Sequence, residues 1–337
     1  MTVDESRKAS RFLKEARNKA KRDYCALCKA KISSFENSHS IPRSILHNIA
    51  EQGWLYSFEQ VAGTEKDPIG VGKSGTFYLL CRKCENEYFR HYENMQQLTE
   101  RPTDLLMAEI ALKDSLLQLY NSLVEKEVYR LLLEQNPKDK YYSNRVSVVE
   151  LDIANFDENT SFYKRIIDNN EQGGFQLLYW KLLPYKIPVA IQSQIPLATD
   201  PYGNTINNNY NYSKRTESLH LVAFPLPNQS VIMAFYHKRD RKYKKVKNLF
   251  KRLTNDEILA YLNYIALKST SNIFFSERIK PYLKSDAIRQ LVREYNEIPD
   301  FGGTIHSWED LLSARNLYHS PDIGEIPCFL LSKYSLE

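Results

Sequence analysis

Four of the five cysteines fall into two C-x-x-C steps, the spacing of a metal site. The four are Cys25, Cys28, Cys81 and Cys84, while Cys328 stands alone. A C-x-x-C step brings two thiolates to one ion from one tight turn, and two steps supply the four sulfur ligands of tetrahedral Zn²⁺. A shell of four thiolates leaves no open position on the metal. The cysteines therefore predict a structural zinc site that folds its surroundings and does not itself hydrolyse a substrate.

A histidine step lies between the two cysteine pairs. It reads SHSIPR over residues 38–43, and Glu85 directly follows the last cysteine. With the flanking cysteines, this step resembles the HNH endonuclease family in its four-cysteine, treble-clef form, over roughly residues 20–95. The resemblance implies a metal-dependent nuclease that hydrolyses the phosphodiester bonds of nucleic acid, with DNA as the expected substrate. Restriction, phage defence and mobile elements are the settings that the resemblance implies.

The same resemblance implies roles for three residues. His39 takes the position of the general base, which removes a proton from the attacking water. Glu85 takes the position of one ligand of the catalytic ion, which would be Mg²⁺ or Mn²⁺. Ser38 stands where the family usually has Asp or His as another ligand, and a hydroxyl is neutral. The alternative interpretation is a non-catalytic, zinc-finger-type module that binds nucleic acid or a protein, in which His39 only packs or caps.

Two groups of cations are candidates for binding the phosphates of nucleic acid. Arg43, Arg82 and Lys83 stand beside the predicted site. Residues 238–252 hold nine Lys and Arg residues against one Asp, and the candidates there are Lys242, Lys244 and Lys245. The alternative for both groups is an ordinary solvated surface. The formal net charge of +5 permits a nucleic-acid partner without requiring one.

Composition places the chain among globular proteins. Its 337 residues are 42% hydrophobic, enough to bury a core, and two or three domains are expected. Mean hydropathy is −0.51, no apolar run approaches the length of a membrane span, and the N-terminus has no apolar signal core. We therefore expect a cytoplasmic protein that does not associate with membranes. In that reducing compartment cysteines bind metal instead of forming disulfides.

We expect an α+β protein in three parts: residues 1–100 form an HNH-like treble-clef zinc module with a basic N-terminal helix, 101–144 a helical connector, and 145–337 an antiparallel sheet with helices, of unknown role. The amphipathic connector is a candidate surface for a partner protein or a second copy of the chain. Strands are predicted over 145–153, 175–184, 187–195, 219–225 and 230–237. Helices are predicted over 4–22, 102–135, 241–252, 254–268, 272–282 and 285–297, with a short one near 307–315.

Overall fold

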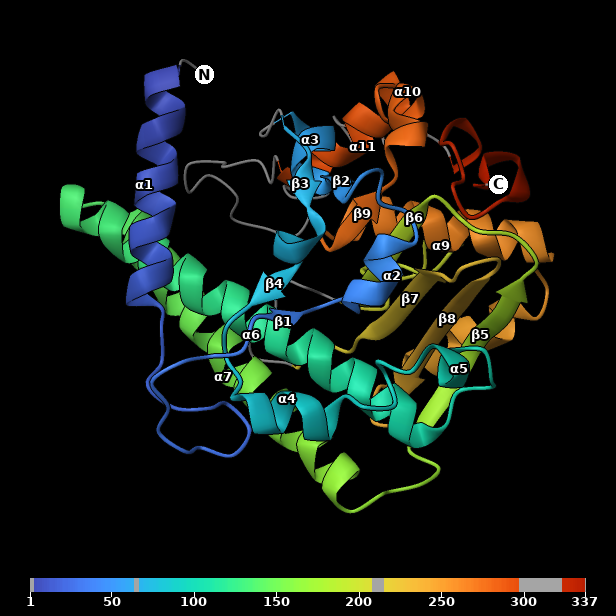
Figure 1. The fold of residues 1–337 in the computed structure, drawn as a ribbon, viewed down its shortest axis with the longest axis horizontal. Helices are drawn as coiled ribbons and strands as arrows, with labels where there is room; N and C mark the ends of the chain where they lie inside the picture. Colours follow the sequence, from blue (N-terminus) through green and yellow to red (C-terminus); the bar gives the residue numbers. More distant parts are fainter. Residues whose placement is uncertain (1–2, 64–66, 208–214, 297–322, 337) are drawn as a thin grey trace.

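A seven-stranded antiparallel sheet forms the centre of the computed structural model, which describes residues 3–63, 67–207, 215–296 and 323–336 (Figure 1). The strand order is β3-β2-β9-β6-β7-β8-β5. The strands are β2 (Trp54–Ser57), β3 (Ile69–Gly70), β5 (Phe175–Leu183), β6 (Val189–Ile195), β7 (Leu219–Pro225), β8 (Ser230–His237) and β9 (Ile273–Phe275). Every residue of β7 is buried. This burial means that helices or loops cover both faces of the sheet.

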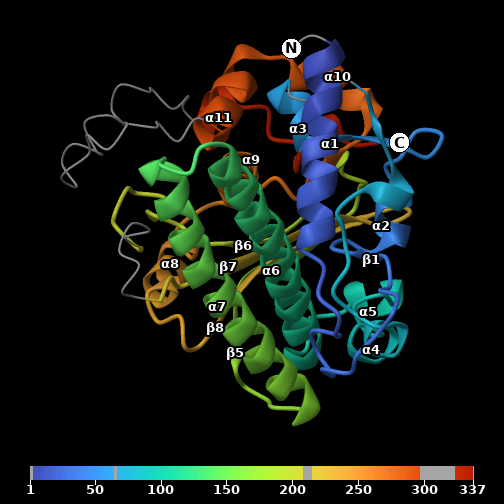
Figure 2. The same ribbon diagram turned by 90° about the vertical axis from the view of Figure 1, so that its left-hand side faces the viewer.

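Helices and loops pack on the two faces of the sheet and make three layers (Figures 1 and 2). The helices are α1 (Val3–Lys19), α2 (Arg43–His47), α3 (Phe58–Ala62), α4 (Arg82–Tyr88), α5 (Met95–Leu98), α6 (Asp104–Gln135), α7 (Lys140–Asp168), α8 (Tyr243–Phe250), α9 (Asn255–Ser269), α10 (Lys280–Leu283) and α11 (Asp286–Asn296). Alternate residues of β7 divide between the two cores. Val222 and Phe224 belong to the core with α6, whereas Leu221 and Ala223 belong to the core with α8 and α9.

The mixed helix and strand content expected from the sequence is confirmed, and most elements lie where they were predicted. The predicted strands near β5, β6, β7 and β8 are present. The helix predicted from residue 102 is α6, which starts where Thr103 Oγ1 accepts a hydrogen bond from Leu106 N at 3.2 Å. Residues 307–315 lie outside the described part of the chain. No helix in that part is long and apolar enough to cross a membrane.

Two predicted elements are wrong. Residues 145–153 belong to the long helix α7 and do not form a strand. Asp139 caps that helix by accepting from the backbone of Tyr141 at 2.8 Å, and Val149 is fully buried. The β-branched residues here therefore pack within a helix, because tertiary packing outweighs a weak strand propensity. Residues 273–275, predicted to be helical, form β9.

The short strand β9 joins the N-terminal part of the chain to the sheet. On one side it pairs with β6, and on the other side Phe275 pairs with Tyr56 of β2. One hydrophobic core contains the side chains of Cys25, Leu80, Leu112 and Phe235. Residues from all three predicted parts thus share this core, and the division into separate domains stays a prediction.

Candidate metal centre and active site

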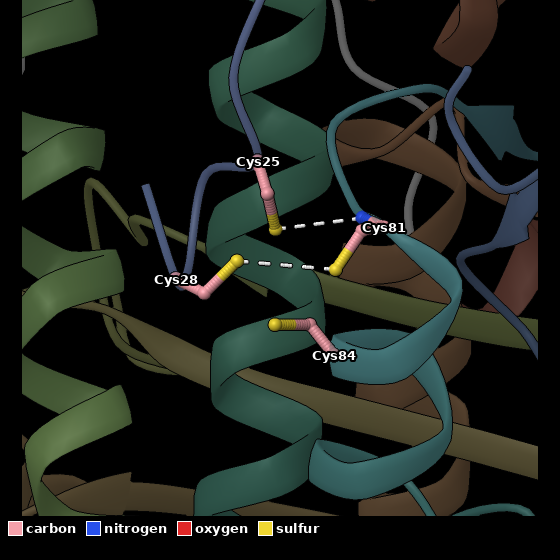
Figure 3. A group of neighbouring side chains, drawn as sticks. All are labelled: Cys25, Cys28, Cys81 and Cys84. Carbon is pink, nitrogen blue, oxygen red and sulfur yellow. Dashed lines mark hydrogen bonds between the residues drawn. The ribbon is translucent and has the colours of Figure 1, made fainter. Parts of the chain in front are cut away.

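The four cysteines of the two C-x-x-C steps converge (Figure 3). Their sulfur atoms all lie within 4.8 Å of one another, and Cys28 Sγ is 3.9 Å from Cys81 Sγ. A tetrahedral zinc with Zn–S bonds of about 2.3 Å has sulfur–sulfur edges of about 3.8 Å. The cluster therefore fits a structural metal ion such as zinc, as the spacing predicted.

Backbone geometry explains why each cysteine pair can share one ion. Lys29 has a positive φ of 61°, which closes a tight turn in which Cys25 N donates to Ala30 O at 2.9 Å. Cys81 is the N-cap of α4, so the last two cysteines stand at a helix N-terminus, where thiolates are favoured. Cys81 N also donates to Cys25 Sγ at 3.4 Å, a bond that stabilises a thiolate ligand.

Burial and backbone donors act in opposite directions on these thiols. Burial raises the pKa of Cys25, but hydrogen bonds from the backbone of Cys28, Cys81 and Leu27 outweigh it and lower that pKa to about 7. Burial raises the pKa of Cys84 far above its ordinary value. Metal ligation requires thiolates, so binding of a metal here must release protons.

His39 lies in a two-stranded antiparallel sheet beside the cysteines, a hairpin with a long insertion between its two strands. β1 (Ser38–His39) pairs with β4 (Thr76–Phe77), and His39 faces Thr76 across the ladder. His39 Nε2 lies 3.2 Å from the carbonyl oxygen of Val71. A carbonyl only accepts, so Nε2 carries the proton and the lone pair is on Nδ1. Burial, followed by the nearby cations of Arg43 and Lys113, lowers the pKa of His39 below its ordinary value, although hydrogen bonds from the ring to the backbone of Val71 and of Asn37 act against them.

The carboxylate of Glu85 accepts hydrogen bonds from two neighbouring side chains. Ser38 Oγ, which is buried, donates to Glu85 Oε2 at 2.7 Å. Lys113 Nζ donates to Glu85 Oε1 at 2.6 Å and lies 3.7 Å from the centre of the Phe89 ring. The Lys113 side chain is fully buried. Glu85 and Ser38 thus come together as predicted, but an internal cation already neutralises the carboxylate.

The role of Lys113 was not expected from the sequence, where this residue lies within the predicted amphipathic helix. Among the described residues, the four cysteines are the one group of three or more His, Cys, Asp and Glu side chains placed to hold a metal. A divalent ion at Ser38 and Glu85 would have two protein oxygens, and Mg²⁺ commonly binds through one or two carboxylates plus waters and substrate phosphates. The site therefore fits such an ion only together with a substrate, and Lys113 would share the carboxylate.

The predicted phosphate-binding residues fall into two separate places. Arg43 is exposed on α2, and Arg82 and Lys83 are exposed in the first turn of α4, next to the cysteines. The second group lies on or beside α8 and comprises Lys242, Lys244 and Lys245, all exposed. That helix packs on the other face of the sheet from α4 and α6. The structure thus brings the first group to the candidate site and keeps the second group away from it.

A chain of buried polar side chains connects the hairpin to the sheet, and sequence reasoning missed it. It runs through Ser40, Tyr92, Gln192, Asp114, His220 and Tyr163. Tyr92 Oη lies 2.5 Å from the Ser40 carbonyl oxygen and 2.6 Å from Gln192 Oε1. Asp114 Oδ2 lies 2.7 Å from His220 Nδ1. Such a network fixes one arrangement of its elements, because every buried polar group needs its partner.

Replacing Tyr92 with phenylalanine should therefore lower the free energy of unfolding by roughly 1–3 kcal/mol. The Tyr92 hydroxyl carries one proton, so its removal leaves one buried acceptor, the Ser40 carbonyl or Gln192 Oε1, without a donor. Urea unfolding measures this. The matched control is Tyr78→Phe, at a ring that is 39% exposed, which should change stability by less than about 0.5 kcal/mol. Equal stability of the two variants would show that the Tyr92 hydroxyl does not support the hairpin.

Comparison of the chain with protein-family models, curated proteins and solved structures finds no match. The resemblance to the HNH endonucleases therefore rests on the residues quoted above.

Proposed function

We propose that the chain is a metal-dependent nuclease whose N-terminal segment is a treble-clef zinc module of the HNH type. The order of elements supports this proposal: a cysteine turn, the β1–β4 hairpin, then α4 with the second cysteine pair. The observation that carries it is the contact of His39 Nε2 with the Val71 carbonyl. This contact leaves the lone pair of a neutral imidazole on Nδ1, the form that a general base requires.

In this proposal Nδ1 of His39 takes a proton from a water molecule as the water oxygen attacks the phosphorus of a phosphodiester. The bond from phosphorus to the leaving sugar oxygen then breaks, and that oxygen keeps the electron pair and takes a proton from solvent. Arg43, Arg82 and Lys83 hold neighbouring phosphates by charge. Glu85 and Ser38 would hold Mg²⁺ or Mn²⁺, which when bound would stabilise the charge that develops on the phosphate. Cys25 and its three partner cysteines would hold Zn²⁺ and keep the hairpin against α4.

A second candidate function is a non-catalytic module that binds nucleic acid, or a protein, through the same surface. One observation favours it: both carboxylate oxygens of Glu85 already have partners, Ser38 and Lys113. A binder needs no ion at this carboxylate, whereas the nuclease does.

Cleavage of plasmid and single-stranded DNA, with Mg²⁺ or Mn²⁺ added, separates the two functions. His39→Ala should slow cleavage by roughly 10²–10⁴-fold, the usual contribution of a general base. The matched control is His47→Ala, since His47 is exposed at the end of α2 and should cut as the parent chain does. No cleavage by the parent chain, with DNA binding equal in both variants, would favour the binding module.

The pH dependence of cleavage should follow the neutral form of His39. Burial lowers the pKa of His39 below its ordinary value, so the neutral, basic form of the imidazole predominates at neutral pH. The rate should stay flat from pH 7 to pH 8 and fall as the pH drops through that lowered pKa. A rate that instead rises steadily between pH 7 and pH 9 would contradict His39 as the base.

A further inference from the structure

A long groove lies beside the candidate active site, outside the residues assigned above. Its volume is about 1190 Å³, above the usual range of a site for one small molecule. The groove is lined by residues of α1, of the middle of α6, and of β2, β3 and β4. Figure 1 shows where these elements lie in the fold. A groove of this size suits an extended ligand.

Aromatic side chains stand along both sides of the groove. Trp54 on β2 is 53% exposed and Tyr78, just after β4, is 39% exposed. Tyr120 and Tyr129, both half-buried, come from α6. The Tyr78 and Tyr120 rings are 6.3 Å apart at 64°. Aromatic faces left open in a groove are platforms on which nucleobases stack.

The charges in the groove are mixed. Arg17 of α1 and Lys73 line it, and so do Glu59, Asp67 and Glu125. Arg145 donates to Glu125 at 2.6 Å, which offsets that acid. With few cations and several rings, the groove suits a ligand that binds mainly by stacking, with about two phosphates held by charge.

The groove leads to His39. Thr76, which lines the groove, is the cross-strand partner of His39. Val71, whose carbonyl holds the imidazole, lies in the chain between Gly70 and Lys73, which both line the groove. A strand of nucleic acid in the groove would therefore pass the hairpin that carries the proposed base.

We infer that this groove binds single-stranded nucleic acid, with bases stacked on Trp54 and Tyr78 and phosphates near Arg17 and Lys73. A duplex keeps its bases stacked on one another and cannot offer them to these rings. The inference that the groove guides the substrate of hydrolysis rests on the proposed function. The inference that the groove binds single strands does not rest on it.

The test is the affinity of the zinc-loaded chain of 337 residues for labelled twelve-nucleotide single strands of DNA and of RNA and for the matching DNA duplex. Single strands should bind more tightly than duplex. Trp54→Ala and Tyr78→Ala should each weaken single-strand binding by roughly 5–150-fold, the loss of one stacked base. The control is Tyr202→Ala, a 60% exposed ring outside the groove, which should bind as the parent chain does. The slope of log affinity against log salt should be about −1.4 for two phosphates.

Equal binding by the parent chain, Trp54→Ala and Tyr78→Ala, or tighter binding of duplex, would overturn the inference. Thermal unfolding of each variant shows whether it folds, and the use of two variants in different segments keeps the test valid if one of them does not fold. Comparing the affinities for the DNA and RNA single strands shows which of the two the groove prefers. His39→Ala separates the two proposals, because it should lose cleavage and keep binding. Groove-dependent binding without cleavage would remove the proposed function and leave this inference standing.

Discussion

Replacing Cys84 with serine is expected to abolish zinc binding and unfold the segment from Cys25 to Tyr88. Structural zinc sites in small modules contribute roughly 10–16 kcal/mol of apparent binding free energy, which is also folding free energy. The hairpin β1–β4 has only two residues in each strand. It cannot be stable without the metal and the core beneath it. Metal analysis of the purified chain should fall from one zinc to near zero, and the thermal transition should move down or split.

The matched control for this prediction is Cys328→Ala. Cys328 is a buried free thiol in the core on the other face of the sheet, with α9. Because it is not one of the four clustered cysteines, its replacement should leave one zinc per chain. A Cys84→Ser chain that still carries a full equivalent of zinc would contradict the four-sulfur site.

Replacing Lys113 with methionine should lower the free energy of unfolding by roughly 3–5 kcal/mol, because it leaves a largely buried carboxylate without its counter-charge. The ammonium is fully buried, donates to Glu85 at 2.6 Å and lies 3.7 Å from the centre of the Phe89 ring. Methionine fills a similar volume, so the change reports mainly the lost charge. Urea unfolding monitored by circular dichroism measures the difference.

A double-mutant cycle shows whether the loss comes from the Glu85 pair. Lys113→Met combined with Glu85→Gln removes both charges, so it should recover at least half of the stability that Lys113→Met loses. Lys83→Met, at an exposed lysine near Glu85, should change stability by less than about 0.5 kcal/mol. If Lys113→Met is as stable as Lys83→Met, the buried ion pair is not a structural feature of the protein.

The metal centre was predictable because the two cysteines of each pair are close neighbours in the sequence. Two residues separate the members of each cysteine pair, and a single turn places both sulfurs, so spacing alone predicts the cluster. The long helix α6 was predictable because its apolar residues recur at helical spacing, and strands β7 and β8 were predictable because they are rich in β-branched and aromatic residues.

The features that sequence reasoning missed depend on partners far away in the chain. β9 has three residues and exists because β6 and β2 flank it. Lys113 lies in an apolar stretch, and only the fold brings Glu85 to its ammonium, 28 residues away in sequence. Asp114 and His220 are 106 residues apart. No local sequence pattern predicts such pairs, because they form only when the layers of the fold pack together.

Zinc-edge X-ray absorption on the purified chain shows directly whether the two cysteine pairs hold one zinc ion. We predict one zinc per chain with four sulfur neighbours at about 2.3 Å and no nitrogen or oxygen ligand. A chain without zinc, or a zinc bound by fewer than four sulfurs, would contradict the account.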